Sequence, residues 1–196
     1  MLRKLLKHEF HATSGYMALI CAGLIGFAGL TRLFLQLDNW FGLFSLPLAI
    51  SMFFYVVLAV ASAVLVYVII IRRFYTNVYG DEGYLTLTLP AKRSKIILSK
   101  LICGVVWIIV DAVVTLGSVC ILAYSTDFVS IVNRAFYYIG AVFAQIKEML
   151  NAPTALLIIE LVLLLLIWLV NSVLVFYAAI SIGQLFTGHR LIGSVA

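Results

Sequence analysis

The longest uncharged stretch of this chain, 39–71, limits its fold more than any other feature. It holds 33 residues without a charged side chain, whereas a helix of about 20 mostly apolar residues already crosses the hydrocarbon core of a bilayer. Three further stretches are long and nearly free of charge: 12–31, 94–124 and 161–188. We therefore predict an all-α, polytopic helical membrane protein that forms a single transmembrane domain over residues 1–196. Its four predicted spans are 12–35, 45–71, 96–124 and 155–186.

The composition agrees with this assignment and excludes other classes of protein. Only 11% of the residues are charged and 65% are hydrophobic, whereas about a quarter of the residues in soluble domains carry charge. A soluble enzyme is therefore excluded, and so is a disordered chain, because disordered chains are poor in apolar residues. The three cysteines lie in apolar stretches and lack the spacing of metal ligands. No Gly-x-x-x-x-Gly-Lys-Ser/Thr loop is present, so we expect no ATP site and no cofactor in this chain.

The basic residues indicate how the chain is oriented in the membrane. Lys and Arg are enriched in the cytoplasmic loops of membrane proteins, and this bias sets their orientation. With a cytoplasmic N-terminus, 10 of the 13 basic residues lie on the cytoplasmic side of the predicted spans. We therefore predict a cytoplasmic N-terminus, and we attribute the net charge of +5 to membrane topology rather than to binding of nucleic acid.

Two further segments have the pattern of amphipathic helices that lie on a membrane surface. Residues 1–11 place leucines and a phenylalanine opposite basic residues, which is typical of an interfacial helix. Apolar residues recur at helical spacing over 127–150, but the uncharged core of this segment is too short for a span. We expect 127–150 to form a helix on the outer surface and 187–196 to begin a further span.

The segment 72–95, between the second and third predicted spans, is the most distinctive loop. It is longer than a turn between two helices requires, and it carries four aromatic residues and the acidic pair Asp81 and Glu82. Aromatic side chains dominate the energetics of protein interfaces, so this loop suits docking onto a partner. The alternative is an amphipathic loop on lipid headgroups, with its basic residues near anionic lipid. Leucine and threonine alternate over 85–89 as in a strand, but a lone strand lacks a partner, so we predict a helix.

The loop and the two ends of the chain resemble parts of one protein family. The loop reads FYTNVYGDEGYLTLTLPAKRSKIILSKL, the N-terminus reads MLRKLLKHEFHAT, and the last stretch reads SIGQLFTGHRLIGS. They resemble three parts of the permease subunits of type-2 ABC exporters: the segment between the second and third helices, the N-terminal elbow helix, and the turn between the fourth and fifth helices. The resemblance is to exporters of peptides from Gram-positive bacteria especially.

The resemblance implies a function and a set of partners. The loop would be a cytoplasmic coupling helix that docks in a groove of a separate ATPase subunit, present in two copies that bind ATP and Mg. A second permease chain, the bacterial cytoplasmic membrane and export of an amphipathic peptide, such as a bacteriocin or a phenol-soluble modulin, are also implied. Such permeases usually have six spans, of which four are predicted here. Carried over by position, the docking role falls on Phe74, Tyr75, Tyr79, Gly80, Asp81, Glu82, Gly83, Tyr84 and Leu85.

Polar residues within the predicted spans are candidates for a substrate path. A charged side chain at the bilayer centre is costly, so such residues face protein or water. The alternative is that these residues fix helix packing through hydrogen bonds, or that a carboxylate near a helix end reaches the headgroups. The candidates are Asp111, Thr115 and Ser118 in the third span and Glu160 and Asn171 in the fourth.

Two other functions are alternatives to a permease. An ion-coupled secondary transporter would use Asp111 and Glu160 as proton or ion sites, but the chain lacks the inverted repeat typical of such transporters. A membrane scaffold or an immunity protein would transport nothing.

Overall fold

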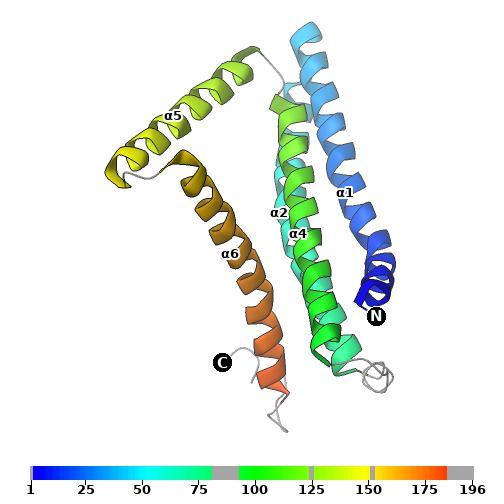
Figure 1. Ribbon diagram of the computed structural model, residues 1–196. Coiled ribbons are helices and arrows are strands. Elements are labelled where there is room, and N and C mark those ends of the chain that lie inside the picture. The colour runs from blue at the N-terminus through cyan, green and yellow to red at the C-terminus, as the bar shows by residue number, and fades with distance from the viewer. Residues whose placement is uncertain (1, 81–92, 124–125, 151–152, 185–196) are drawn as a thin grey trace.

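The computed structural model describes residues 2–80, 93–123, 126–150 and 153–184. Figure 1 shows three of its helices, α1, α2 and α4, side by side as a bundle, with α5 leading away from it and α6 returning toward it. No strand occurs among these residues, which confirms the predicted all-α class. The described helices are α1 (Leu2–Phe41), α2 (Ser45–Val78), α4 (Arg93–Ala123), α5 (Thr126–Leu150) and α6 (Thr154–Gly183).

Four of these helices are long and apolar enough to cross a membrane. Each predicted span overlaps one of them, so the chain is a membrane protein with transmembrane helices. Large apolar side chains on their outward faces are exposed, among them Leu165 and Trp168 at 53% and 65%, as expected where lipid rather than water surrounds the fold. The four segments are Arg3–Phe41, Ser45–Val78, Ser94–Leu122 and Ala155–Gly183.

The first helix, α1, is much longer than a membrane span. Its 40 residues form a helix about 60 Å long, roughly twice the thickness of the hydrocarbon core. The helix is continuous through residues 11 and 12, so the predicted interfacial helix over 1–11 is not a separate element but the first part of α1. Its amphipathic pattern is nevertheless present, because Leu6 and Phe10 are half-buried while Lys7 is exposed.

A tight turn joins α1 to α2. Gly42 has a φ of +64°, a left-handed conformation that glycine adopts without steric cost, and its amide donates to the Asp38 carbonyl at 2.7 Å. The Asp38 side chain accepts a further bond from the Phe44 amide at 3.0 Å. Pro47 lies in the first turn of α2, where its missing N–H costs no helical hydrogen bond. These local contacts let α2 run back beside α1.

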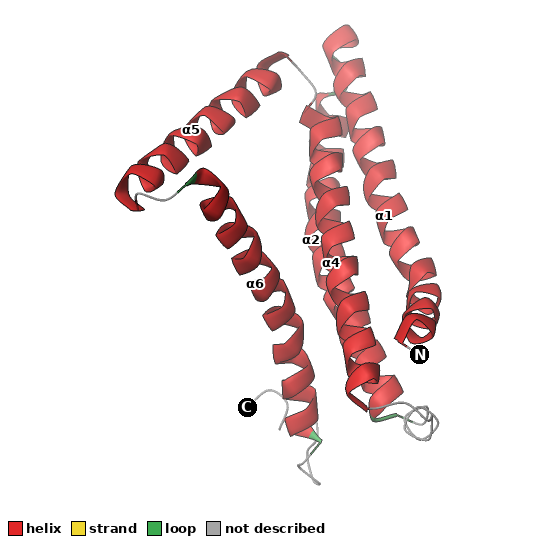
Figure 2. Cartoon of the chain, in the orientation of Figure 1, coloured by secondary structure: helices red, strands yellow, loops and turns green. Residues whose placement is uncertain are grey.

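The hydrophobic core lies between α1, α2 and α4, in two clusters along the bundle. The first cluster consists of Leu24, Ala28, Tyr55 and Leu122. The second cluster adds two residues of α6 to the core and consists of Met17, Val66, Ile70, Phe74, Val173 and Tyr177. Helix α6 therefore meets the bundle near the end where α2 finishes, as the converging ribbons in Figure 2 show.

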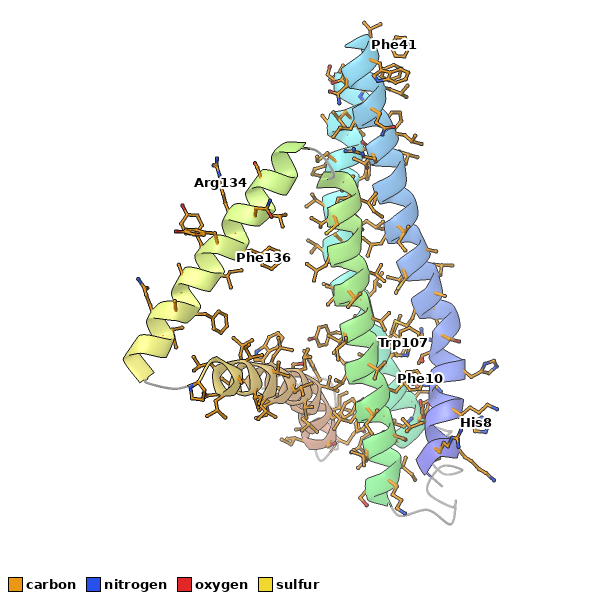
Figure 3. All side chains as sticks on the ribbon, turned by 45° about the horizontal axis from the view of Figure 1, so that its top comes forward. His8, Phe10, Phe41, Trp107, Arg134 and Phe136 are labelled. Carbon is orange, nitrogen blue, oxygen red and sulfur yellow. The ribbon has the colours of Figure 1, made fainter. Side chains whose placement is uncertain are left out.

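Helix α5 connects α4 to α6 and lies apart from the bundle. Figure 3 shows Arg134 and Phe136 on different sides of this helix. The side chains of Phe136, Tyr137 and Tyr138 are 67% exposed or more. The helix predicted over 127–150 is thus confirmed by α5, while its location on the outer membrane surface stays a prediction.

Candidate functional site

Three charged side chains, Glu9, Arg73 and Lys100, meet at the end of the bundle where α1 begins and α2 ends. Arg73 Nε donates to Glu9 Oε2 at 2.6 Å, and Lys100 Nζ donates to Glu9 Oε1 at 2.6 Å. The Lys100 side chain is 3% exposed and the Glu9 side chain 13%. One carboxylate thus joins three helices, α1, α2 and α4. We call these three residues the charge cluster.

Further contacts hold α1 to α4 beside the charge cluster. Thr13 Oγ1 accepts a hydrogen bond from Trp107 Nε1 at 2.9 Å and donates to the Glu9 carbonyl at 2.8 Å. The rings of Phe10 and Trp107 lie 6.0 Å apart. Figure 3 shows His8, by contrast, pointing away from the bundle. Because Glu9 and Thr13 are four residues apart, they lie on the same face of α1. That face therefore makes the ion pairs and the hydrogen bond together.

The ring of Phe74 connects the same region to α6. It stacks on the ring of Tyr177 with centroids 3.8 Å apart and an interplanar angle of 9°, and both residues are buried. Together with Glu9 and Lys100, they border a cavity of about 20 Å³, which has room for roughly one water molecule. Such a cavity is too small for a substrate, and the residues that border it come from α1, α2, α4 and α6.

Electrostatics explain how the charge cluster can hold α1, α2 and α4 together. A buried charge is costly unless it is paired, and removing one partner of a buried pair costs about 3–5 kcal/mol. Glu9 compensates two cations at once, so the ends of three helices are held in one arrangement. Helix α2 ends at Val78, five residues after Arg73, and α4 begins at Arg93, seven residues before Lys100.

Only part of the predicted docking loop is described. Helix α2 continues to Val78, so the first residues of the predicted loop 72–95 are helical. Phe74 is 3% exposed and packs inside the chain, which leaves it unsuited to the docking surface predicted for it. Tyr75 and Tyr79 are each 40% exposed and remain open to a partner. Five predicted residues lie outside the described residues: Asp81, Glu82, Gly83, Tyr84 and Leu85.

Gly80 was also predicted to take part in docking, but the local backbone explains why a glycine stands at this position. Its amide donates to the Tyr75 carbonyl at 3.1 Å as α2 ends. A Cβ atom at this position would lie 2.6 Å from the Thr76 carbonyl oxygen, closer than real Cβ atoms come. The end of α2 therefore accounts for this glycine without reference to a partner.

The three predicted path residues of α4 have different surroundings. Asp111 is buried, and its Oδ1 has no hydrogen-bond partner among the described residues. Ser62 of α2 lies close to this carboxyl. Ser118 is buried, bonded to the Tyr55 hydroxyl at 2.7 Å and to the carbonyl of half-buried Thr115. Ser118 therefore holds α2 against α4, which is the helix-packing role considered as the alternative to a substrate path.

The two predicted path residues of α6 lie elsewhere. Glu160 and Asn171 are both exposed, while Leu169 and Val173 are buried where α6 meets the bundle. Asn171 is two positions from each of these buried residues, so it projects from the opposite side of the helix. The polar residues of α4 and those of α6 therefore do not line one common path within this chain.

The charge cluster was not predicted from the sequence. In the linear sequence, Arg73 and Lys100 serve only as topology signals, and Glu9 lies within an amphipathic stretch. One signal was available, because Glu9 is the only acidic residue before Asp38 and stands among basic residues. A lone carboxylate at the edge of an apolar span needs a paired cation when it is buried. The sequence alone does not identify which basic residue forms that pair.

The described part of the chain contains no group of three or more His, Cys, Asp or Glu side chains that could hold a metal ion. Comparisons of the chain with known protein families, with curated proteins and with solved structures found no match. The function is therefore inferred from the residues, from their geometry and from the resemblance of the three stretches.

Proposed function

We propose that this chain is the membrane-spanning permease subunit of an ATP-driven exporter. A separate ATPase subunit, present in two copies, binds ATP and Mg and docks onto the segment 72–95. A second permease chain completes the complex in the bacterial cytoplasmic membrane, with the N-terminus in the cytoplasm. The substrate is amphipathic, most simply a peptide, because the spans carry few charges to match an ionic solute.

The charge cluster is the observation that carries this proposal. Coupling requires a firm connection between the docking segment and the helices that move during transport. Glu9 joins the last turns of α2 and the first turns of α4, which flank that segment, to α1. The stacked pair Phe74 and Tyr177 extends the connection to α6. A movement of the docking segment would therefore be passed to four helices together.

Exposed aromatic residues next to the charge cluster also support a docking surface. Tyr75 and Tyr79 are exposed at the end of α2, and the acidic pair Asp81 and Glu82 follows them in the sequence. Aromatic anchors surrounded by polar groups are typical of the energetically important part of an interface. In the proposal, these tyrosines replace Phe74 as the anchors that α2 contributes.

Asp111 favours a second candidate function, an ion-coupled secondary transporter. A buried ionisable residue within the membrane commonly marks a proton or ion site, and the Oδ1 of Asp111 has no partner among the described residues. The second carboxyl expected for this function, Glu160, is exposed on α6. The two carboxyls thus do not share a site in this chain, and the permease is the better supported proposal.

Purification of the full chain from its native membrane in mild detergent tests the permease proposal. We expect a stoichiometric nucleotide-binding partner to copurify and to hydrolyse ATP. The double variant Glu82→Arg, Tyr84→Ala should lose both the partner and the activity, because it reverses a charge and removes an aromatic anchor. Tyr137→Ala removes an exposed tyrosine from α5 instead and should keep both.

Retention of partner and activity by the double variant would show that the docking assignment is wrong. A transport assay separates the two candidate functions. Export that stops on ATP depletion supports the permease. Transport that survives ATP depletion but collapses with an uncoupler would instead support ion coupling.

A further inference from the structure

We infer that the chain binds the phosphate of an anionic phospholipid in a groove between α1 and α2. The groove has a volume of about 250 Å³ and lies beside the charge cluster. It is lined by Thr13 and Tyr16 from α1 and by Ile69, Arg72, Thr76 and Asn77 from α2. The inference requires insertion into a membrane but does not depend on the exporter proposal.

Arg72 supplies the positive charge that such a phosphate needs. It is exposed at the groove and makes no hydrogen bond or ion pair within the described part of the chain. Arg73 also lines the groove, but its Nε is bonded to Glu9. None of the described residues that line the groove is acidic. A guanidinium presents its donors as a planar fork that matches two phosphate oxygens.

Neutral donors surround Arg72 in the groove. Thr76 lies four residues after Arg72 and therefore on the same face of α2. Its hydroxyl and the hydroxyl of Tyr16 can each donate a hydrogen bond to a phosphate oxygen. One charged fork with two neutral donors is a combination suited to a phosphate group, and basic pockets between transmembrane helices bind lipid headgroups.

The position of the groove along α2 matches the headgroup level of a bilayer. The 33 residues that precede Arg72 are uncharged, so Arg72 stands where the apolar span ends. Tyrosine is enriched at this level of membrane proteins, and Tyr16 is 68% exposed at the groove.

The polarity of the groove distinguishes a lipid from a free phosphate. Along α2, the apolar Ile69 lies toward the span and Thr76 lies away from it. The apolar end of the groove thus faces the acyl-chain region of the bilayer, and its polar end faces the phosphate region. A free phosphate would make no use of the apolar part, so we assign the groove to a lipid.

Spin-labelled lipids test this inference with the full chain in phosphatidylcholine vesicles. Electron paramagnetic resonance measures the fraction of labelled lipid that the protein immobilises. We expect labelled phosphatidylglycerol to be preferred severalfold over labelled phosphatidylcholine. Arg72→Gln should lower this preference about fivefold, the effect of one basic residue near an anionic surface. Thr76→Val should lower it about twofold, through loss of one neutral hydrogen bond.

The matched control is Arg134→Gln, which removes an exposed cation from α5 and should leave the preference unchanged. If the control loses the preference equally, or if Thr76→Val loses none of it, general attraction between charges explains the preference. Either result would overturn the assignment of the groove as the lipid site. Sodium phosphate that displaces the label better than sodium chloride at equal ionic strength would show a site for free phosphate instead.

Discussion

Glu9 is the residue whose replacement should disturb the bundle most, because Arg73 and Lys100 share its carboxylate. Glutamine keeps the shape of the side chain but leaves the two cations beside each other without that charge. We predict that Glu9→Gln lowers the free energy of unfolding by about 3–5 kcal/mol, the cost of breaking a buried ion pair. Lys100→Met should cost less, because Glu9 keeps Arg73 and the methionine occupies a similar volume.

Unfolding of the purified chain by SDS in mixed micelles, followed by far-UV circular dichroism, measures these differences. Lys7→Gln is the control, because Lys7 is exposed on the same helix and its replacement should change stability by about 0.5 kcal/mol or less. Equal losses for Glu9→Gln and Lys7→Gln would show that the charge cluster does not stabilise the bundle.

At the scale of helices, the close packing of α2 on α4 depends on Gly104. A Cβ atom at this position would lie 3.2 Å from Ile70 Cγ2, whereas a Cβ atom at Gly117 on the same helix would meet nothing within 4 Å. Small residues let transmembrane helices approach each other closely. We predict that Gly104→Leu destabilises the fold by about 1–3 kcal/mol through overpacking, while Gly117→Leu leaves stability nearly unchanged.

Thermal unfolding of the two leucine variants in detergent compares the same substitution on one helix. The difference between them removes the general effect of adding a leucine to α4. Identical midpoints for the two variants would mean that α2 and α4 do not meet at Gly104 as closely as the structure places them.

At the scale of the whole molecule, the outer face of α6 is open to a partner. Asn171 lies there near the middle of the helix, exposed beside Ile167, Val170 and Leu174. An amide in hydrocarbon needs a hydrogen-bond partner, and it offers both a donor and an acceptor. In the proposed complex, the same residue of a second copy of this chain can satisfy both groups.

We predict that Asn171→Leu lowers the association constant between two copies in vesicles about threefold. This loss corresponds to about 0.6 kcal/mol, the average contribution of an interhelical hydrogen bond in a membrane. Energy transfer between fluorescently labelled copies measures the association. Gln145→Leu, which replaces an exposed amide on α5, is the control, and an unchanged association for Asn171→Leu would place the second chain on another face.

The four long apolar helices could be predicted from the sequence because crossing a membrane is a local requirement. The stretch 39–71 must satisfy its backbone hydrogen bonds within a helix, since hydrocarbon offers it no water. The helix over 127–150 followed from its apolar spacing alone. The predicted boundary after residue 11 is not present in the structure, and no glycine or proline between Leu2 and Ser14 would break the helix there.

The contacts between distant residues could not be predicted in this way. Glu9 is 64 residues from Arg73 and 91 from Lys100, so their meeting depends on how three helices pack. Phe74 was predicted from the sequence to lie on the docking surface, but its side chain is buried against α6. Lipid and protein interior are both apolar, so the composition of a span does not say which face meets which. The sequence alone therefore determined an all-α membrane protein, whose described part has four helices long and apolar enough to span a bilayer. Only tertiary packing decided which of its polar groups come together.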